Sequence, residues 1–527
     1  MSYIEGVSRN QAILFPEVID EYIEEDNQVQ FIEAFVDNLA LGELGFNRSV
    51  PASTGRPPYN PADLVKLYIY GYLNRIRSSR SLERESCRNI EVMWLLRKLT
   101  PDFKTIADFR KDNKKAIKGV CKEFVVLCKK LNLFSGELVA IDGSKFKAVN
   151  SKKRNFNEAK LKKKIREIEN KIDEYLIELD EADRDEKDVH NPDKEELKKK
   201  IEEIKRRKEV YGEQLEKLKE SGETQVSLTD PDSRAMMNNQ RIEVCYNVQL
   251  TVDDKYKLIV DHEVSNEVKD DKQLSKMAKR AKEILGVEKL EVLADKGYYN
   301  SVEIKECVDS GITPYIPELE STIPEDVNIY HKEEFKYDAK QDVYVCPRGN
   351  KLTYRNSATH HGRLMRLYKS EECKSCPMLS RCTRGKRGRI IYRWEHEEVL
   401  EQMRERVRRE KDKVKKRNIL IEHIFGTMKR GFNQGYMLMK GKEKVSAEIS
   451  LTVLAYNIKR VLKIIGLERL KEAVSMGGNL RKTICDNIKE THLYIYKFFA
   501  TSLKLCSVSD CGIFKKRIKN ELTFHTV

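Results

Sequence analysis

Glu137-Leu-Val-Ala-Ile-Asp142-Gly-Ser-Lys-Phe-Lys-Ala-Val149 contains the clearest buried strand of this 527-residue chain. Its apolar run, residues 138–141, is rich in β-branched side chains. Ser135-Gly136 precedes the run and Gly143-Ser144 follows it, which predicts a short strand buried on both faces. Asp142 comes directly after this run. An acid in that place is either the cap of the next turn or a metal ligand, and taken alone the cap is the commoner role.

Two later stretches carry acids that are suited to join Asp142. Leu290-Glu-Val-Leu-Ala-Asp295-Lys-Gly-Tyr-Tyr299 is again a short apolar strand that ends in an aspartate. Arg417-Asn-Ile-Leu-Ile-Glu422-His-Ile-Phe-Gly-Thr-Met-Lys429-Arg430 has apolar residues at helical spacing, and Glu422 and Lys429 lie seven apart on one helix face. Two aspartates on strand ends and one glutamate on a helix predict a three-carboxylate site for two hard cations.

In this order, Asp142, Asp295 and Glu422 resemble the acids of the DDE transposases of bacterial insertion sequences. The residues around Asp295 resemble that family's second-aspartate strand, and the residues from Ile421 to Lys429 resemble its glutamate helix. Three further stretches also resemble the family: Gly55-Arg-Pro-Pro-Tyr-Asn-Pro61, Tyr246-Asn-Val-Gln249 and Leu454-Ala-Tyr-Asn-Ile-Lys-Arg460. The resemblance therefore covers about residues 15–465.

The resemblance implies an α/β fold: an RNase H-like mixed sheet core with an N-terminal all-α domain. It also implies catalysis by Asp142, Asp295 and Glu422 with bound Mg²⁺ or Mn²⁺, first cleaving transposon ends and then joining them to target DNA. One departure concerns the family's Tyr-x2-Arg-x3-Glu-x6-Lys signature. Here Asn418 stands at the arginine position, with Arg417 one residue early, and Lys415 stands at the tyrosine position. Hairpin chemistry at the DNA end is therefore left open.

Composition agrees with a polyanionic partner. The net charge is +15 and the isoelectric point is near 9.0, which favours double-stranded DNA over a membrane surface. The first residues carry no basic signal-peptide region, and no apolar run approaches the roughly 20 residues of a membrane span. The sequence therefore predicts a cytoplasmic protein, associated with the nucleoid when bound to DNA, whose cysteines are reduced. A homodimer on DNA is expected.

The predicted domains follow changes in the pattern of the chain. Residues 1–130 form a helical DNA-binding domain, and residues 131–150 and 224–320 form the first parts of the core. Residues 151–223 form an antiparallel coiled-coil insertion, because two heptad patterns are interrupted at Asp188-Val-His-Asn-Pro192. Residues 321–400 form a Cys-rich insertion, residues 401–470 carry the Glu422 helix and a closing helix, and residues 471–527 form a tail of unknown role.

Four cysteines fall in the second insertion: Cys346, Cys373, Cys376 and Cys382. Four thiolates in a tetrahedral array suit structural zinc, although only Cys373 and Cys376 have the usual short spacing. Reduced free cysteines are the alternative. A catalytic thiol is not expected, because no histidine accompanies the cluster.

Basic residues beside the predicted site are candidates for contact with DNA phosphates. A run from Arg404 to Arg417 leads into the Glu422 helix, which indicates a groove that follows the DNA backbone rather than a merely solvated face. The candidates are Lys416, Arg417, Lys429 and Arg430 near the site, and Arg75, Arg77 and Arg80 in the helical domain. Two other functions remain compatible with the sequence: a metal-dependent nuclease, and a transposase-derived DNA-binding protein without activity.

Overall fold

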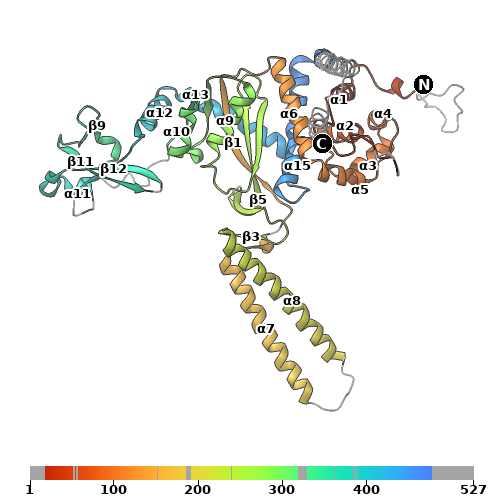
Figure 1. Cartoon of the computed structure of the whole chain (residues 1–527), viewed down its shortest axis with the longest axis horizontal. Coiled ribbons are helices and arrows are strands. Elements are labelled where there is room, and N and C mark those ends of the chain that lie inside the picture. Colours follow the sequence, from red (N-terminus) through yellow and green to blue (C-terminus); the bar gives the residue numbers. More distant parts are fainter. Residues whose placement is uncertain are drawn as a thin grey trace, which may run out of the picture.

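The computed structural model describes residues 18–51, 54, 57–150, 152–184, 192–238, 240–318, 329–360, 362–383, 385 and 388–476. Gly55 and Arg56 of the first quoted motif, most of the predicted break at 188–192, and residues 477–527 of the tail lie outside these ranges. Figure 1 shows an elongated molecule in which a central sheet lies between a helical region and a second, smaller sheet. A long helical hairpin projects from the central sheet.

The central sheet is built around the strand that the sequence predicts first. Strand β1 (Leu138–Lys147) pairs antiparallel with β5 (Arg241–Asp253) and parallel with β7 (Leu290–Leu293), which in turn pairs parallel with β8 (Ile312–Tyr315). Strands β4 (Arg234–Asn238) and β6 (Ile259–Ser265) both pair antiparallel with β5. The order β6-β5-β1-β7-β8 is that of an RNase H-like mixed sheet, so the predicted fold class is confirmed.

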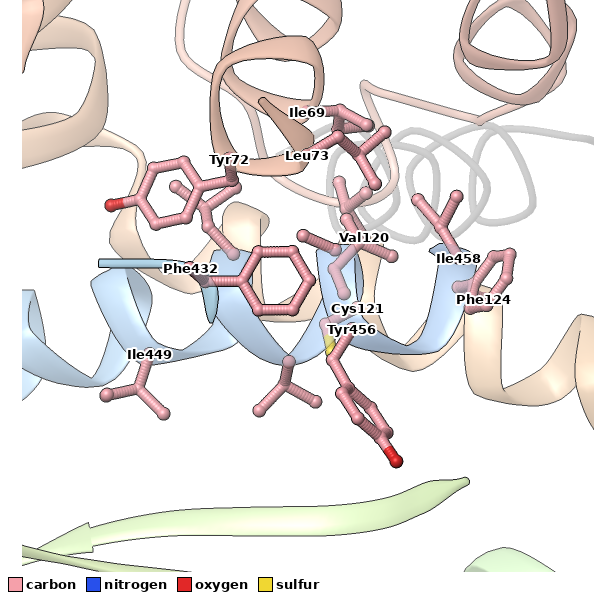
Figure 2. Packing of buried hydrophobic residues seen from close by; sticks show 14 of the residues in the cluster. Ile69, Tyr72, Leu73, Val120, Cys121, Phe124, Phe432, Ile449, Tyr456 and Ile458 are labelled. Carbon is pink, nitrogen blue, oxygen red and sulfur yellow. The ribbon is translucent and has the colours of Figure 1, made fainter. Parts of the chain in front are cut away.

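Helices cover both faces of this sheet. Its two cores include the buried side chains of α9 (Leu274–Leu285) and α10 (Ser301–Asp309) on one face, and those of α15 (Lys442–Ile465) on the other. Most of α15 is buried, because it packs against β6 on one side and against the helical region on the other. Figure 2 shows this contact, with Ile458 of α15 beside Phe124 of the helical region, whereas Ile449 lies on the side of α15 that faces the strands.

The helical region precedes the sheet in the sequence. The α-helices among its described residues are α1 (Gln28–Asp37), α2 (Pro61–Leu73), α3 (Ser79–Arg88), α4 (Ile90–Leu95), α5 (Phe103–Asp112) and α6 (Lys114–Lys130). The predicted start of α2 is confirmed, since Asn60 caps the helix by accepting a hydrogen bond from the Ala62 N–H and Pro61 is its first residue. The apolar side chains of α2 and α6 join the same core as α15 and the sheet.

The first insertion is a pair of long helices, α7 (Glu158–Arg184) and α8 (Pro192–Ser221), which lie side by side and run in opposite directions (Figure 1). A two-stranded ladder of β2 (Asn155–Phe156) and β3 (Val226–Ser227) closes its root. Lys208, which interrupts the heptad pattern of α8, pairs with Glu169 of α7 at 2.9 Å. The charged side chain of Lys208 thus has a partner on the opposite helix of the hairpin.

The second insertion contains a small antiparallel sheet with the order β13-β12-β11-β10-β9. Its strands are β9 (Lys336–Asp338), β10 (Val343–Val345), β11 (Lys351–His360), β12 (Arg363–Lys369) and β13 (Ile390–Trp394), and a short helix, α11 (Leu379–Cys382), lies between the last two. Phe335, Tyr344, Leu352, Tyr368 and Ile391 form its own small core. The chain then returns to the central sheet through α12 (Glu397–Arg409) and α13 (Lys411–Arg417).

A buried ion pair joins the helical region to the last part of the core. The guanidinium of Arg77 donates to the Glu448 carboxylate of α15 at 2.6 Å and to the backbone carbonyls of Asn433 and Tyr436. Glu448 is fully buried and also accepts from the N–H groups of Leu438 and Met439. The buried side-chain amide of Gln434 also donates to this carboxylate, at 3.1 Å. No described helix is long and apolar enough to span a membrane.

We expect Glu448→Ala to destabilise the protein by about 3–5 kcal/mol, because it leaves the Arg77 charge buried without its partner. Denaturant unfolding followed by tryptophan fluorescence measures this change. The matched control is Glu443→Ala, since Glu443 lies on the same helix and also pairs with a cation of the helical region, Lys114, but its side chain is 67% exposed. Its loss is expected to change the stability little, because an exposed ion pair contributes little; equal effects of the two variants would contradict this account.

Candidate active site

The parallel pairing of β1 with β7 brings the two predicted aspartates close together, although β1 does not end at Asp142 as predicted: it runs on to Lys147, and Asp142 pairs with Leu250 within the sheet. Ala140 lies opposite Leu293 in that pair, and each aspartate follows its strand partner by two residues. Asp142 is partly buried, and its Oδ1 accepts a hydrogen bond from the Gly143 N–H at 2.8 Å. Asp295 caps a turn of 3-10 helix by accepting from the Gly297 N–H at 2.9 Å. The two acids are thus presented by rigid neighbouring strands.

Arg417 connects the third acid to the first. One guanidinium nitrogen of Arg417 donates to Asp142 Oδ2 at 2.8 Å, and the other donates to Glu422 Oε1 at 3.3 Å. Side-chain exposure is 15% for Asp142 and for Arg417 and 55% for Glu422. Among the described residues, no group of three or more His, Cys, Asp or Glu side chains is placed to hold a metal ion as it stands. At this site the arginine lies between two of the three carboxylates.

The helix that carries Glu422 is not a regular α-helix. Residues Asn418–Glu422 form a π-helical turn, α14 (His423–Gly426) follows, and Thr427–Gly431 form a second π-helical turn. In a π-turn the backbone hydrogen bonds run between residues five apart instead of four. Arg417 and Glu422 are five apart, so this turn puts both side chains on the face that meets Asp142.

The ionisation of Asp142 is shifted by its surroundings. The pKa of its carboxyl is raised to about 6, mainly by burial; the negative charges of Asp295 and Asp270 also raise it, whereas Arg417 and the Gly143 N–H lower it. Asp295 is therefore near enough to act on Asp142. Asp142 is difficult to ionise because it is buried and lies near two other acids. A bound cation would favour its ionised form, which is typical of a cation-binding site. These oxygen donors fit a hard divalent cation.

A buried polar network lies beneath Asp142. Asn247 and Gln249 are fully buried on β5 and both donate to Asp270, at 2.5 and 2.7 Å. Gln249 lies opposite Gly143 in the sheet and accepts a hydrogen bond from the buried hydroxyl of Tyr298, three residues after Asp295. A Cβ at Gly143 would lie 2.3 Å from the Gln249 amide nitrogen, so only glycine fits there. The network ties the two aspartate turns to each other.

This network was missed by the sequence analysis. The motif Tyr246-Asn-Val-Gln249 contained a usable signal, because Asn247 and Gln249 alternate onto one face of an otherwise apolar strand. Asp270 gave no comparable signal: it lies in a loop before α9, and only the folded chain brings it to Asp142.

The predicted DNA-contacting residues fall into two groups. Lys416 and Arg430 are exposed, as are Arg75 and Arg80 in the helical region. Lys429 is partly buried beside the site, where its ammonium group donates to the hydroxyl of Ser144 at 2.8 Å and burial lowers its pKa. Arg417 faces the carboxylates. Arg77 is buried in the ion pair with Glu448, so in this arrangement its role is structural and it is not available to a phosphate.

The four cysteines of the second insertion lie near one another. Burial raises the pKa of the Cys382 thiol, and Cys373, Cys346 and Cys376 each add to that increase. Cys346 and Cys382 also line the core of the small sheet. In the described part of the chain these thiols are reduced and do not form a ready-made metal group.

Without divalent cation, we expect Asp142→Asn to stabilise the protein at neutral pH. Because its pKa is raised in the folded state, ionising Asp142 destabilises the folded protein relative to the unfolded chain. This destabilisation is absent well below pH 4, grows as the pH rises to about 6, and amounts to about 3 kcal/mol above that pH. Unfolding in EDTA at pH 5 and pH 7.5 measures it. The gain should be larger at pH 7.5, whereas Asp412→Asn, at a fully exposed acid, should change little. A variant less stable than wild type at pH 7.5 would refute the electrostatic account.

Comparison with known proteins adds to this geometry. Residues 345–462 match a family model described as a transposase DDE domain, and residues 17–112 match one described as a transposase domain (DUF772). The first match runs from the small sheet to α15 and contains Glu422; the second covers the helical region up to α5. No curated protein matches the sequence.

Among solved structures, the chain matches a cryo-EM structure of the piggyBac transposase synaptic complex with hairpin DNA. The identity is 9%, the match covers 88% of this chain and 85% of that one, and the TM-score is 0.27. The two family-model matches support a DDE transposase of the insertion-sequence type.

Proposed function

We propose that this chain cuts double-stranded DNA at the ends of a mobile element and joins those ends to target DNA, with Asp142, Asp295 and Glu422 as its catalytic acids. The observation that supports the proposal is that the guanidinium of Arg417 pairs with both Asp142 and Glu422, while the charge of Asp295, just after β7, acts on Asp142. Mg²⁺ or Mn²⁺ bound by these carboxylates would activate the attacking water or 3′-hydroxyl and stabilise the leaving oxygen.

The chain's own residues have distinct tasks in this proposal. Asp142 and Asp295 are fixed by the sheet and by the Gln249–Asp270 network, so the acids need not reorganise before the reaction. Lys429 lies beside Ser144, two residues after Asp142, where its ammonium group suits a phosphate next to the bond that is cut. Exposed Lys416 and Arg430 extend that positive edge, and Arg75 and Arg80 would contact phosphates farther along the DNA.

Other features of the proposal follow from this reaction. Two DNA ends have to be brought together, which suggests a homodimer on DNA, and the DNA substrate suggests a cytoplasmic protein at the nucleoid. Incubation with end-containing DNA and Mg²⁺, followed by a denaturing gel, separates the alternatives. Joined product supports a transposase, cleavage alone supports a metal-dependent nuclease, and retention of uncut DNA supports a DNA-binding protein without activity.

We expect Glu422→Gln to lower DNA cleavage by orders of magnitude while leaving DNA affinity nearly unchanged. The substitution removes one charged ligand of the proposed site, whereas attraction to DNA comes from the many Lys and Arg residues. Gel-shift affinity and Mg²⁺-dependent cleavage are measured on the same duplex. Glu405→Gln, at an exposed acid of α12, is the control and should cleave like wild type. Full cleavage by Glu422→Gln would remove this residue from the site and direct attention to Glu405, Glu410 and Asp412.

We also propose that Cys346, Cys373, Cys376 and Cys382 bind one structural zinc ion, supported by their mutual influence on the Cys382 thiol. Elemental analysis of the purified protein should find one zinc per chain. The double variant Cys373→Ser/Cys376→Ser should lose it, and Cys87→Ser, at an exposed cysteine of α3, should keep it. Absence of zinc from the wild-type protein would reject the site.

A further inference from the structure

Most of the chain's net positive charge falls in the segment that forms the small sheet. Residues 346–394 contain thirteen Lys or Arg residues and two Glu residues, so this short segment carries +11 of the chain's net +15. Figure 1 shows the sheet at one end of the molecule, on the opposite side of the core from the helical region. Such an excess of like charge works against a compact fold. The core of the small sheet has only five large side chains, so the repulsion between its positive charges lowers its stability noticeably.

Among the described residues of this segment, carboxylates neutralise part of this charge: Arg366 pairs with Asp342, and Arg393 pairs with Glu401. Several arginines stack on aromatic rings: Arg381 lies 5.6 Å from the Tyr330 ring centre, and Arg389 lies 5.4 Å from that of Phe335. Stacking fixes a guanidinium but does not cancel its charge, and it leaves the N–H groups at its edge able to donate. Carboxylates do pair with other basic residues of the sheet, yet Arg355 and Lys374 share a single one, Glu371.

One face of the sheet is open and carries both positive and aromatic side chains. The register pairs Lys369 with Ile390 and Leu367 with Tyr392, so these residues share a face, and Lys351 lies on that face because Thr353 pairs with Lys369. Tyr392 is 40% exposed and Ile390 36% exposed. Along β11, Leu352 alone is buried. Met365 and Trp394 share this face and pack with Leu400 and Met403 of α12, so its open part is the end that carries Lys351, Lys369 and Ile390.

Length and position both suit DNA as the occupant. Ten residues of antiparallel strand extend about 34 Å, which is about one turn of B-DNA. At the start of β12, Arg363 donates to the hydroxyl of Ser301 at 2.7 Å. Ser301 begins α10, six residues after Asp295, so the sheet is attached next to the proposed active site. A duplex lying on the sheet would lead towards the acids.

We propose that the β9–β13 sheet, together with the turn Glu371–Ser375 beside it, is a second DNA-binding surface, which holds the phosphate backbone of the duplex through the exposed side chains of Lys351 and Arg355 on β11 and Lys374 on the turn, and does not read its sequence. This inference rests on the proposed function, because it takes DNA as the substrate. An acidic protein partner is the competing occupant, and it would leave the DNA affinity unaffected by changes in the sheet.

The test compares two triple variants with the same change in net charge. Lys351→Gln/Arg355→Gln/Lys374→Gln changes the sheet, and Lys163→Gln/Lys199→Gln/Lys217→Gln changes exposed lysines of the helical hairpin. The affinity of each protein for an end-containing duplex and a scrambled duplex is measured between about 50 and 200 mM salt. Removing one phosphate neutralisation lowers the slope of log affinity against log salt by about 0.9. We expect the slope of the sheet variant to fall by about 2–3 with both duplexes, and the hairpin variant to match wild type.

Equal salt slopes for the two variants would overturn the proposal. A loss of affinity by the sheet variant for the end-containing duplex alone would also overturn it, because such a loss indicates contacts with the bases. A wild-type protein that binds neither duplex would instead refute the proposed function itself. The substitutions in the sheet could prevent it from folding, so a second measurement uses the wild-type full chain: acetylation of its lysines with and without bound DNA. DNA should protect Lys351, Lys369 and Lys374 from the reagent several-fold more than Lys163 and Lys217. Equal protection of the two sets would reject the surface.

Discussion

Three carboxylates are difficult to hold close together at the edge of a buried sheet without positive charge between them. In this structure Arg417 supplies that charge by contacting Asp142 and Glu422 with two nitrogens of one guanidinium. The parallel pair β1–β7 fixes the two aspartates, and the π-turn delivers both the arginine and the glutamate. An arginine charge therefore already lies between two of these acids, and in the proposed function a divalent cation would have to replace or share it.

A buried ion pair between Arg77 and Glu448 connects the region of the site to the helical region. The segment after the second π-turn provides the backbone carbonyls and N–H groups that surround Arg77 and Glu448. Helix α15 then fills the space between the central sheet and the helical region. Because the buried pair involves residues 371 positions apart, the helical region cannot move away from the core without exposing or separating it. The two family-matched regions thus act as one packed unit.

Several features could be predicted from the sequence because a local pattern specifies them. The apolar runs before Asp142 and Asp295 predict the strands, and the cap at Asn60 predicts the start of α2. Features that depend on distant contacts could not be predicted. Asp270 reaches Asp142 from a loop, and Arg77 looks like an exposed cation until its partner on α15 is known. The small sheet was expected only as a Cys-rich insertion, because its strands are short and its arginines hide the alternation of apolar residues.

The π-turn at Asn418–Glu422 also affects how such proteins are found. A motif with fixed spacing assumes that four residues make one turn of the helix, and by that rule the residue facing Glu422 is Asn418. In this chain the widened turn holds one more residue, so the arginine at the acids is Arg417. An insertion of one residue can therefore leave a reactive surface intact while it breaks the written signature. Relatives that carry a similar turn would be rejected by a pattern search although their side chains meet in the same way.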